Sequence, residues 1–345
     1  MIREKIPVIL CLDVEPDPRI PKIAARDHWE GFERTYHLLA PFRARLEQAT
    51  ENPVHYSWFF RLDPQIKRLY GHAAWLLHHY SSWIRNLEQY QDELGVHPHT
   101  FRWDPQAEEW VAEHEDLDYC KTCVQMSFDE YRDFFGRNCT AYRFGDRWTS
   151  SEAIQWCEAN GAKFDLTLEP GLEPRPHVML RERHTGSLPD FRTVPQEPYI
   201  PSRKDFRIKD TQGRTGPVMI PLSCAKIPGI LGALHRFSRK TLRQKTCEQP
   251  VLTLSLDLKP WIFRILIGEF LKRSVRPYLA MVTRVGSASK TRTAAFMRAN
   301  LDSLVNHPRV RDFVFSTPAE AFALLRGPEE KDNAEIQVRP SFAMP

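Results

Sequence analysis

The chain has 345 residues, of which 42% are hydrophobic, 11% aromatic and 27% charged, and its formal net charge at pH 7 is +4. This composition can build a core and excludes a disordered chain. Because the net charge is small and the Lys and Arg residues are scattered, nucleic acid is not expected as the main partner.

The amino terminus, MIREKIPVILCLDVEPD, contains a short apolar run that ends in acidic residues. It lacks the long hydrophobic region and cleavage site of a signal peptide, so we interpret it as a first strand. No stretch approaches the ~20 apolar residues that span a bilayer. The seven dispersed cysteines fit a reducing compartment. We therefore expect a cytoplasmic protein without a membrane span.

Apolar, β-rich runs alternate with helical patterns along the chain. The runs are PVILCLD from 7, VHYSWFFRL from 54, LGVH from 94, AYRF from 141, KFDLTL from 163, VLTLSLDL from 251, PYLAMVTR from 277 and DFVFS from 312. Helical spacing covers 31–49, 65–92, 149–160, 260–273, 291–306 and 317–326. This rhythm predicts an α/β fold with parallel strands, and its number of units favours a (β/α)7–8 barrel over an open doubly wound sheet.

We expect one barrel domain over residues 1–326. Residues 172–216 interrupt the rhythm with prolines and charges, which predicts a long insertion over one face, at the site. Residues 327–345 are polar and predict a flexible tail. Cys120 and Cys123 form a CxxC without a second one, which favours ordinary thiols on a helix over a structural zinc site.

The stretch HPH places His97 and His99 one residue apart. In an extended chain both imidazoles point to the same side, where they could face one metal ion. Two polar residues in an ordinary turn are the alternative, because the pair alone is unspecific.

Ionisable residues end five successive predicted strands. They are Asp13, Glu15 and Asp17; Arg61 and Asp63; His97 and His99; Arg143 and Asp146; and Asp165 and Glu169. Since functional groups of a β/α barrel gather at the carboxyl ends of its strands, we expect these side chains to share one pocket. Carboxylates and imidazoles in one pocket suit an ion that activates water.

Four segments, in order, resemble the motifs of the polysaccharide deacetylases of the NodB homology type. CLDVEPD (11–17) corresponds to T-F-D-D-G, and ELGVHPH (93–99) corresponds to E-x-G-x-H-[ST]-x-x-H. YRFGDRW (142–148) corresponds to the arginine motif, and DLTLEPG (165–171) corresponds to D-x-S-x-x-P. The resemblance implies a distorted β/α barrel that uses a divalent metal to remove an N- or O-acetyl group from a carbohydrate.

Carried over by position, the resemblance implies catalytic roles for Asp13, Arg143 and Asp165 and a metal-binding role for His97. The family's base is an aspartate that the arginine orients. The implied cofactor is a divalent metal, with zinc as the first expectation and cobalt, manganese or nickel as alternatives. From the residues alone, an ion pair between Arg143 and Asp165 is an equal alternative.

Three positions depart from the family's pattern, of which the first two concern the metal ligands and the third concerns the general acid. Val14 stands in place of the second acid, so the metal carboxylate is Asp13 or Glu15. The second histidine of the motif falls on Phe101, which leaves His99 as its substitute. We expect the metal ligands to be Glu15, His97 and His99.

The late histidine that serves the family as general acid falls near Thr283 and Arg284. Arg284 could instead stabilise an oxyanion. We expect the substrate to be bound by strand-end charges and by tryptophans that stack on sugar rings, namely Arg61, Asp63, Trp103, Asp146, Trp148 and Arg284.

Two other readings remain. The chain could be a catalytically silent relative of the deacetylases that binds a glycan or a protein, which the departures at Val14 and Thr283 favour. It could also be an unrelated metal-dependent hydrolase barrel, although there the His-x-His pair lies on the first strand. The particular sugar and the oligomeric state are not specified by these patterns.

Overall fold

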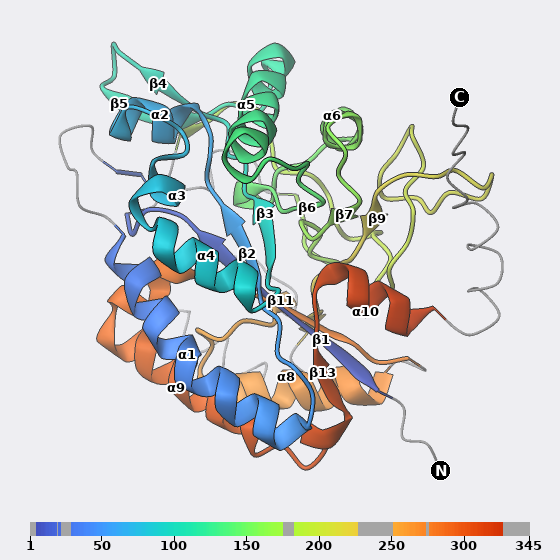
Figure 1. Ribbon diagram of the computed structural model, residues 1–345. Coiled ribbons are helices and arrows are strands. Elements are labelled where there is room, and N and C mark those ends of the chain that lie inside the picture. The colour runs from blue at the N-terminus through green and yellow to red at the C-terminus, as the bar shows by residue number, and fades with distance from the viewer. Residues whose placement is uncertain are drawn as a thin grey trace, which may run out of the picture.

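The computed structural model describes residues 5–18, 20–21, 29–174, 183–226, 251–273 and 276–326. The predicted tail, 327–345, and residues 175–182 of the predicted insertion lie outside the described residues. A curled parallel sheet forms the centre, and helices cover its outer face (Figure 1). The predicted α/β barrel architecture is confirmed.

The main sheet has eight strands in the order β12-β1-β2-β3-β6-β7-β9, with β13 also paired to β1. All of its ladders are parallel, as the alternation of strands and helices predicts. The strands are β1 (Ile6–Val14), β2 (Ser57–Phe60), β3 (Glu93–Val96), β6 (Ala141–Tyr142), β7 (Phe164–Asp165), β9 (Val218–Met219), β12 (Leu279–Arg284) and β13 (Phe313–Phe315).

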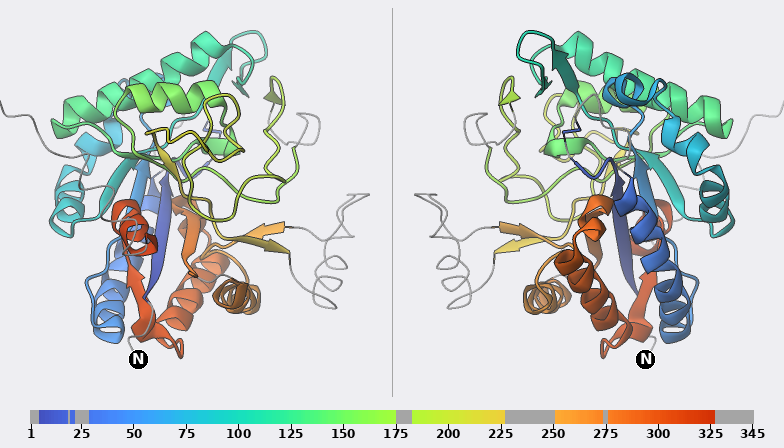
Figure 2. Two further views of the ribbon diagram at one scale, coloured as in Figure 1. Left: turned by 90° about the vertical axis from the view of Figure 1, so that its right-hand side faces the viewer. Right: turned by 90° about the vertical axis from the view of Figure 1, so that its left-hand side faces the viewer.

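The edges β9 and β12 are joined by irregular chain rather than by a regular ladder. Ser223 N donates to Ala280 O at 2.8 Å, and Val282 N donates to Leu254 O at 3.1 Å. The run VLTLSLDL, predicted as a barrel strand, forms β11 (Val251–Thr253), which pairs antiparallel with β10 (Cys224–Lys226). This ribbon projects away from the barrel (Figure 2). The barrel is therefore distorted at this seam.

Most helices match the predicted segments closely, and the helix Leu117–Phe135 falls outside them, although the sequence predicts a helix around Cys120 and Cys123. One difference is 65–92, which is divided into three helices because Gly71 ends the first of them in the left-handed region, at φ 92°. The helices are α1 (Glu30–Thr50), α2 (Pro64–Tyr70), α3 (Trp75–His79), α4 (Ser81–Gln89), α5 (Leu117–Phe135), α6 (Ser151–Ala159), α8 (Pro260–Arg273), α9 (Thr291–Val305) and α10 (Pro318–Leu325).

A small second sheet, not predicted from the sequence, lies near the carboxyl ends of the strands (Figure 1). It consists of β4 (Phe101–Asp104), β5 (Glu109–Ala112) and β8 (Arg183–His184), with β4 and β5 antiparallel. Within 183–216, the only regular strand is β8, so this part of the predicted insertion is largely irregular. That the insertion covers the site remains a prediction.

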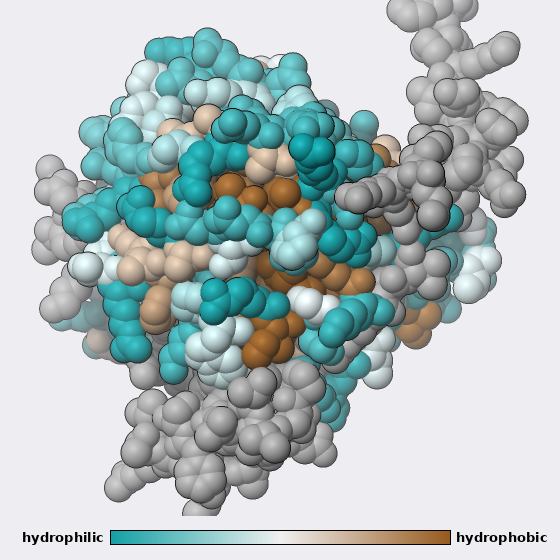
Figure 3. Space-filling model, turned by 90° about the horizontal axis from the view of Figure 1, so that it is seen from below, coloured by the Kyte–Doolittle hydropathy of each residue, from teal (hydrophilic) through white to brown (hydrophobic). Residues whose placement is uncertain are grey.

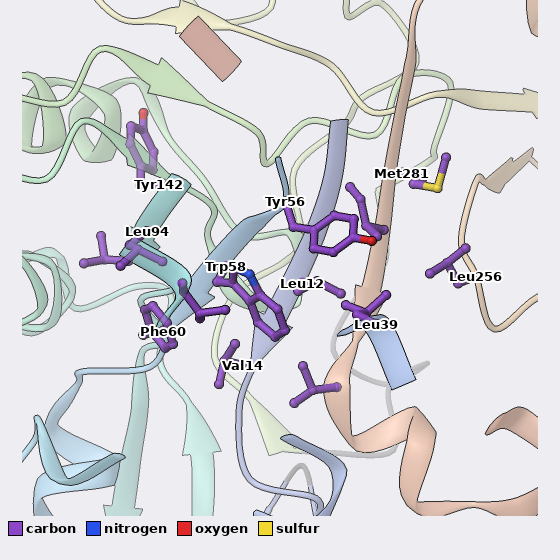
Figure 4. Close-up of a cluster of buried hydrophobic side chains, with 14 of the residues drawn as sticks. Leu12, Val14, Leu39, Tyr56, Trp58, Phe60, Leu94, Tyr142, Leu256 and Met281 are labelled. Carbon is purple, nitrogen blue, oxygen red and sulfur yellow. The ribbon is translucent and has the colours of Figure 1, made fainter. Parts of the chain in front are cut away.

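Alternation along the strands divides the buried side chains into two layers. Leu12 and Val14 of β1 face the helices, where they join a core that includes Trp58, Phe60 and Met281 (Figure 4). Residues one position away belong to a second cluster in the barrel interior, as Ile9, Cys11, Phe59, Ala141, Leu166 and Ala280 do. Every second residue counted from Cys11 therefore points into the barrel, and we call these positions the interior phase of a strand.

In the view from below, hydrophobic residues lie in groups divided by hydrophilic ones (Figure 3). No helix in the described part of the chain is long and apolar enough to cross a membrane.

One buried ion pair ties α1 to the start of the sheet. Arg43 Nη2 donates to Asp92 Oδ2 at 2.7 Å, and its guanidinium lies 4.4 Å from the ring centre of Tyr56. Asp92 also accepts from Tyr56 N and from Trp58 Nε1, each at 2.9 Å. All the acceptors of the carboxylate are thus used inside the core, and removal of either charge leaves the other unpaired.

We predict that Asp92→Ala lowers the free energy of unfolding by about 3–5 kcal/mol, because it leaves the Arg43 charge buried without a partner. Urea denaturation followed by circular dichroism measures this change. Asp302→Ala is the control, since its ion pair with Arg45 is half exposed and is worth less than about 1 kcal/mol. Equal effects of the two substitutions would contradict the prediction.

Candidate metal centre

The polar residues at the strand ends meet at the carboxyl-terminal mouth of the barrel. Asp13 follows the interior phase of β1 and lies in register with Arg284 of β12. His97 and Arg143 continue the interior phases of β3 and β6, in which Gly95 and Ala141 are the preceding inward positions. Because neighbouring parallel strands end together, residues distant in sequence become neighbours here.

Glu15, His97 and His99 each offer one ligand atom, and these atoms lie within 4.8 Å of one another. His97 Nε2 is 3.2 Å from His99 Nε2, and Glu15 Oε2 is 3.4 Å from His99 Nε2. The three residues are only 2–5% exposed. No other such group of three occurs among the residues that the structure describes. The predicted metal-binding trio is therefore brought together.

His97 is oriented by the backbone of the arginine motif. Its Nδ1 lies 2.7 Å from the carbonyl oxygen of Arg143, which can only accept, so Nδ1 carries the proton. Burial is the main reason that the pKa of His97 falls to about 4, so the ring is neutral at physiological pH. The lone pair of Nε2 is then directed toward His99 and is available to a metal.

His99 receives a carboxylate on each side of its ring. Its Nδ1 lies 3.3 Å from Asp146 Oδ2, and its Nε2 faces Glu15. Burial and Arg61 oppose a charge on this ring, but Asp146 and Glu15 outweigh them and raise the pKa of His99. The space between Glu15, His97 and His99 therefore favours a positive charge, which either a proton or a metal ion can supply.

This arrangement fits a divalent ion. Glu15 Oε2 is buried and has no hydrogen-bond partner, although a carboxylate oxygen without one is costly inside a protein. Two imidazole nitrogens and one carboxylate oxygen are the ligands of many catalytic zinc sites, which leave further positions open. Metal binding would satisfy all three atoms together.

Arg284 contacts the same glutamate from β12. Its Nε forms an ion pair with Glu15 Oε1, and its Nη2 donates to Pro16 O at 2.6 Å. Burial alone would raise the pKa of Glu15, but Arg284 and the two histidines hold it well below its usual range. Glu15 is consequently ionised, as a metal ligand must be.

Asp13 is held apart from the trio by Arg143. Arg143 Nε donates to Asp13 Oδ1 at 2.9 Å, and Nη1 donates to Leu166 O at 2.9 Å. Asp13 Oδ1 is 3.9 Å from His97 Nδ1, on the side of the ring opposite to Nε2. The sequence left Asp13 and Glu15 as alternative ligands, and in this arrangement Glu15 is the acid that faces both imidazoles.

Glu169 completes the surroundings of Arg143. Its Oε1 lies 3.6 Å from Arg143 Nη2, and its Oε2 accepts from Thr253 Oγ1 at 2.6 Å. Sequence reasoning recognised Glu169 as a strand-end residue but gave it no role. Glu169 lies four residues beyond Asp165, after the end of β7. The path of the loop, and not the alternation of the strand, therefore directs its side chain into the barrel interior.

Asp165 is not brought to this group. Phe164 and Leu166 face the barrel interior, so Asp165 between them faces the helices, where Tyr142 and Cys157 surround it. Burial is the main cause that raises its pKa to about 6. Arg143 makes its ion pair with Asp13 rather than with Asp165. A catalytic role for Asp165 has no contact with the trio to support it.

The residues predicted to bind substrate occupy different places. Arg61 and Asp63 are fully buried and joined by two hydrogen bonds, of 2.7 and 2.9 Å, so this pair presents no surface to a ligand. Asp63 Oδ2 instead accepts from His99 N at 3.3 Å. Asp146 contacts His99, and Arg284 contacts Glu15. Asp63, Asp146 and Arg284 therefore contact residues of the candidate metal-binding trio, and Arg61 holds Asp63.

The two predicted tryptophans also differ. Trp148 is 5% exposed and packs between Phe144 and the ring of His114. Trp103 lies on the β4–β5 hairpin, where it is half-buried against Trp110. Trp103 is thus the one of the two with a surface open to a ligand.

The CxxC pair lies inside α5 as two buried thiols. Cys120 Sγ donates to Glu113 O at 3.3 Å, and burial raises the pKa of Cys120 to about 12. In the described residues, these thiols are not part of any three-ligand group. The preference for ordinary thiols agrees with this environment.

Gly145 allows the closest approach to the trio. A Cβ atom built on Gly145 would lie 2.0 Å from His99 Nε2, so a larger residue cannot share this space with the ring. Nothing in the sequence marks Gly145 as special, because its contact partner lies 46 residues earlier.

We predict that Gly145→Ala displaces the His99 ring and weakens zinc binding about tenfold or more. Competition with a chromophoric chelator measures the affinity. The control is Gly268→Ala in α8, where an added Cβ has no atom within 4 Å. Unchanged affinity in the Gly145 variant would show that His99 is not a ligand.

No family model matches the chain, and a search of curated proteins finds no match. Among solved structures, one described as a glycoside hydrolase/deacetylase from Parabacteroides distasonis has a TM-score of 0.54 at 13% identity, covering 93% of this chain and 71% of that one. One described as a polysaccharide deacetylase from Mycobacterium smegmatis has a TM-score of 0.48 at 12% identity, covering 100% and 96%. The likeness to the first of these structures agrees with the fold that the resemblance in the sequence implies, a distorted β/α barrel.

Proposed function

We propose that the protein is a metal-dependent hydrolase that removes an N- or O-linked acetyl group from a carbohydrate. The observation that carries the proposal is the convergence of Glu15 Oε2, His97 Nε2 and His99 Nε2 in one buried space. The carbonyl oxygen of Arg143 holds the Nδ1 proton of His97, so the lone pair that would bind an ion is on Nε2, 3.2 Å from His99 Nε2. The deacetylase names of the structural neighbours agree with this chemistry.

Glu15, His97 and His99 would hold the ion. A bound divalent ion lowers the pKa of water toward neutrality and polarises a carbonyl oxygen. Zinc suits two imidazoles and one carboxylate, while cobalt, manganese and nickel accept the same ligands.

Asp13 is the proposed general base. Arg143 Nε fixes one oxygen of its carboxylate at 2.9 Å, and this oxygen lies 3.9 Å from His97 Nδ1, on the other side of that ring from Nε2. Asp13 takes the proton of the attacking water at a carboxylate oxygen and can return it to the departing nitrogen or oxygen of the sugar. Arg143 positions the base and is itself held by Glu169 and by the carbonyl of Leu166.

Arg284 and Trp103 are proposed to act on the substrate. Arg284 is 28% exposed at its side chain, so it can contact an oxyanion while it remains paired with Glu15. Trp103, on the β4–β5 hairpin, offers a partly exposed ring on which a sugar can stack.

A catalytically silent binding protein is the second candidate function. The end of β12 favours it, because Thr283 and Arg284 occupy the positions where the resembling family carries a histidine. Thr283 Oγ1 accepts from Leu256 N at 3.0 Å, and Arg284 is engaged by Glu15. Neither side chain can serve as a general acid in the way that a histidine imidazole does.

We predict that the purified protein binds one equivalent of zinc and that Glu15→Gln and His97→Ala reduce this to a trace, because each removes one of three ligands. Elemental analysis after dialysis measures the bound metal. His37→Ala, which removes an exposed histidine of α1, should retain the full equivalent. A wild-type protein without affinity for any of the four metals would refute the proposed centre.

We predict that Asp13→Asn retains the metal but lowers kcat by about a hundredfold to ten-thousandfold, since it removes only the general base. Release of acetate from N- and O-acetylated oligosaccharides, with and without a chelator, measures the activity. Asp302→Asn on the surface is the control. If the metal-loaded wild-type protein binds these sugars but releases no acetate, the silent candidate is favoured instead.

A further inference from the structure

The short spacing of the histidine pair requires outside support. His97 and His99 are separated only by Pro98, yet their rings lie at 79° to one another with centres 4.8 Å apart. Two parts of the chain hold the backbone here, because Asp63 Oδ2 accepts from His99 N and Gly145 N donates to Pro98 O at 3.0 Å. The second of these contacts comes from the turn after β6.

This turn, formed by residues 145–147, has an unusual backbone. Asp146 and Arg147 have φ values of 55° and 62°, in the left-handed region that disfavours residues other than glycine, although aspartate tolerates it better than most. Strained backbone of this kind persists where the surrounding structure requires it and gathers at functional sites.

The turn is anchored on both sides of Asp146. Phe144 N donates to Thr167 Oγ1 at 2.9 Å, and Trp148 N donates to Gly145 O at 3.0 Å. The ring of Trp148 is stacked on that of His114, with centres 5.6 Å apart. These contacts hold the Asp146 carboxylate, whose side chain is 7% exposed, 3.3 Å from His99 Nδ1.

We propose that Asp146 is a positioning residue for His99, which turns the His-x-His pair into a usable pair of metal ligands. The carboxylate favours the proton on Nδ1, so that Nε2 presents its lone pair to Glu15 and His97. Gly145 gives the ring room, and Asp146 sets its direction. The inference rests on the proposed metal centre and deepens it, because it names the residue that compensates for the short spacing.

The test uses Asp146→Asn and Asp146→Gly in the full chain. Asparagine tolerates the left-handed region, and glycine adopts it without strain, so both variants keep the turn while they remove the charge. Asp118→Asn on the exposed face of α5 is the matched control. We expect both Asp146 variants to bind zinc about tenfold to a hundredfold more weakly than the wild type, with unchanged thermal unfolding of the metal-free protein.

A second measurement does not depend on metal or on activity. In metal-free protein with ¹⁵N-labelled histidine, the ring shifts of His99 report which nitrogen carries the proton. At a pH high enough to leave the His99 ring neutral, we expect the Nδ1–H form in the wild type and the control, and its loss in both Asp146 variants. A change in the ring shifts cannot come from the turn alone, because glycine preserves the turn.

Zinc affinity within twofold of the wild type in either Asp146 variant would overturn the inference. A wild-type protein that binds no metal would refute the proposed function, and the ring shifts would still decide the role of Asp146. In that case, unaltered ring shifts of His99 in both variants would overturn the proposed role of Asp146, and altered ring shifts would support that role.

Discussion

Arg143 is the residue on which the mouth of the barrel depends. Its side chain joins Asp13 of β1 to the carbonyl of Leu166 beyond β7, and its own carbonyl accepts the Nδ1 proton of His97. One residue thus orients both the proposed base and a proposed metal ligand. Its buried charge is compensated by Asp13 and Glu169, so the removal of Arg143 would leave two carboxylates unpaired in the interior.

The inward-facing side chains of the strands are apolar or small along most of the strand and become charged or polar at its carboxyl end. Cys11 lies below Asp13 on β1, and Gly95 lies below His97 on β3. The opposite phase remains hydrophobic, since Leu12 and Val14 pack against the helices (Figure 4). Both layers bury apolar side chains, and the inner layer concentrates charge only at the carboxyl ends of the strands.

The departures from the deacetylase motifs are linked through their contacts. Val14 cannot be a ligand, and Glu15, one residue later, turns toward the imidazoles, with Arg284 at its other oxygen. The shortened histidine pair is approached by Gly145 and Asp146. Each change of ligand is thus accompanied by a residue on a neighbouring strand end that holds the substitute. This is the pattern expected if the site binds an ion with a rearranged ligand set.

The sequence by itself determined the parallel α/β barrel, because apolar runs and helical spacing reflect burial that any such fold requires. It also placed Glu15 just after one predicted strand and His97 and His99 together at the end of another. Only the tertiary structure decided that Asp165 faces the helices while Glu169 returns to the interior, since β7 has two residues, too few to reveal its phase. Likewise, the roles of Asp63, Gly145 and Asp146 around His99 arise from contacts between distant segments. Such contacts leave no periodic pattern along the chain, and they exist only once the strands are side by side.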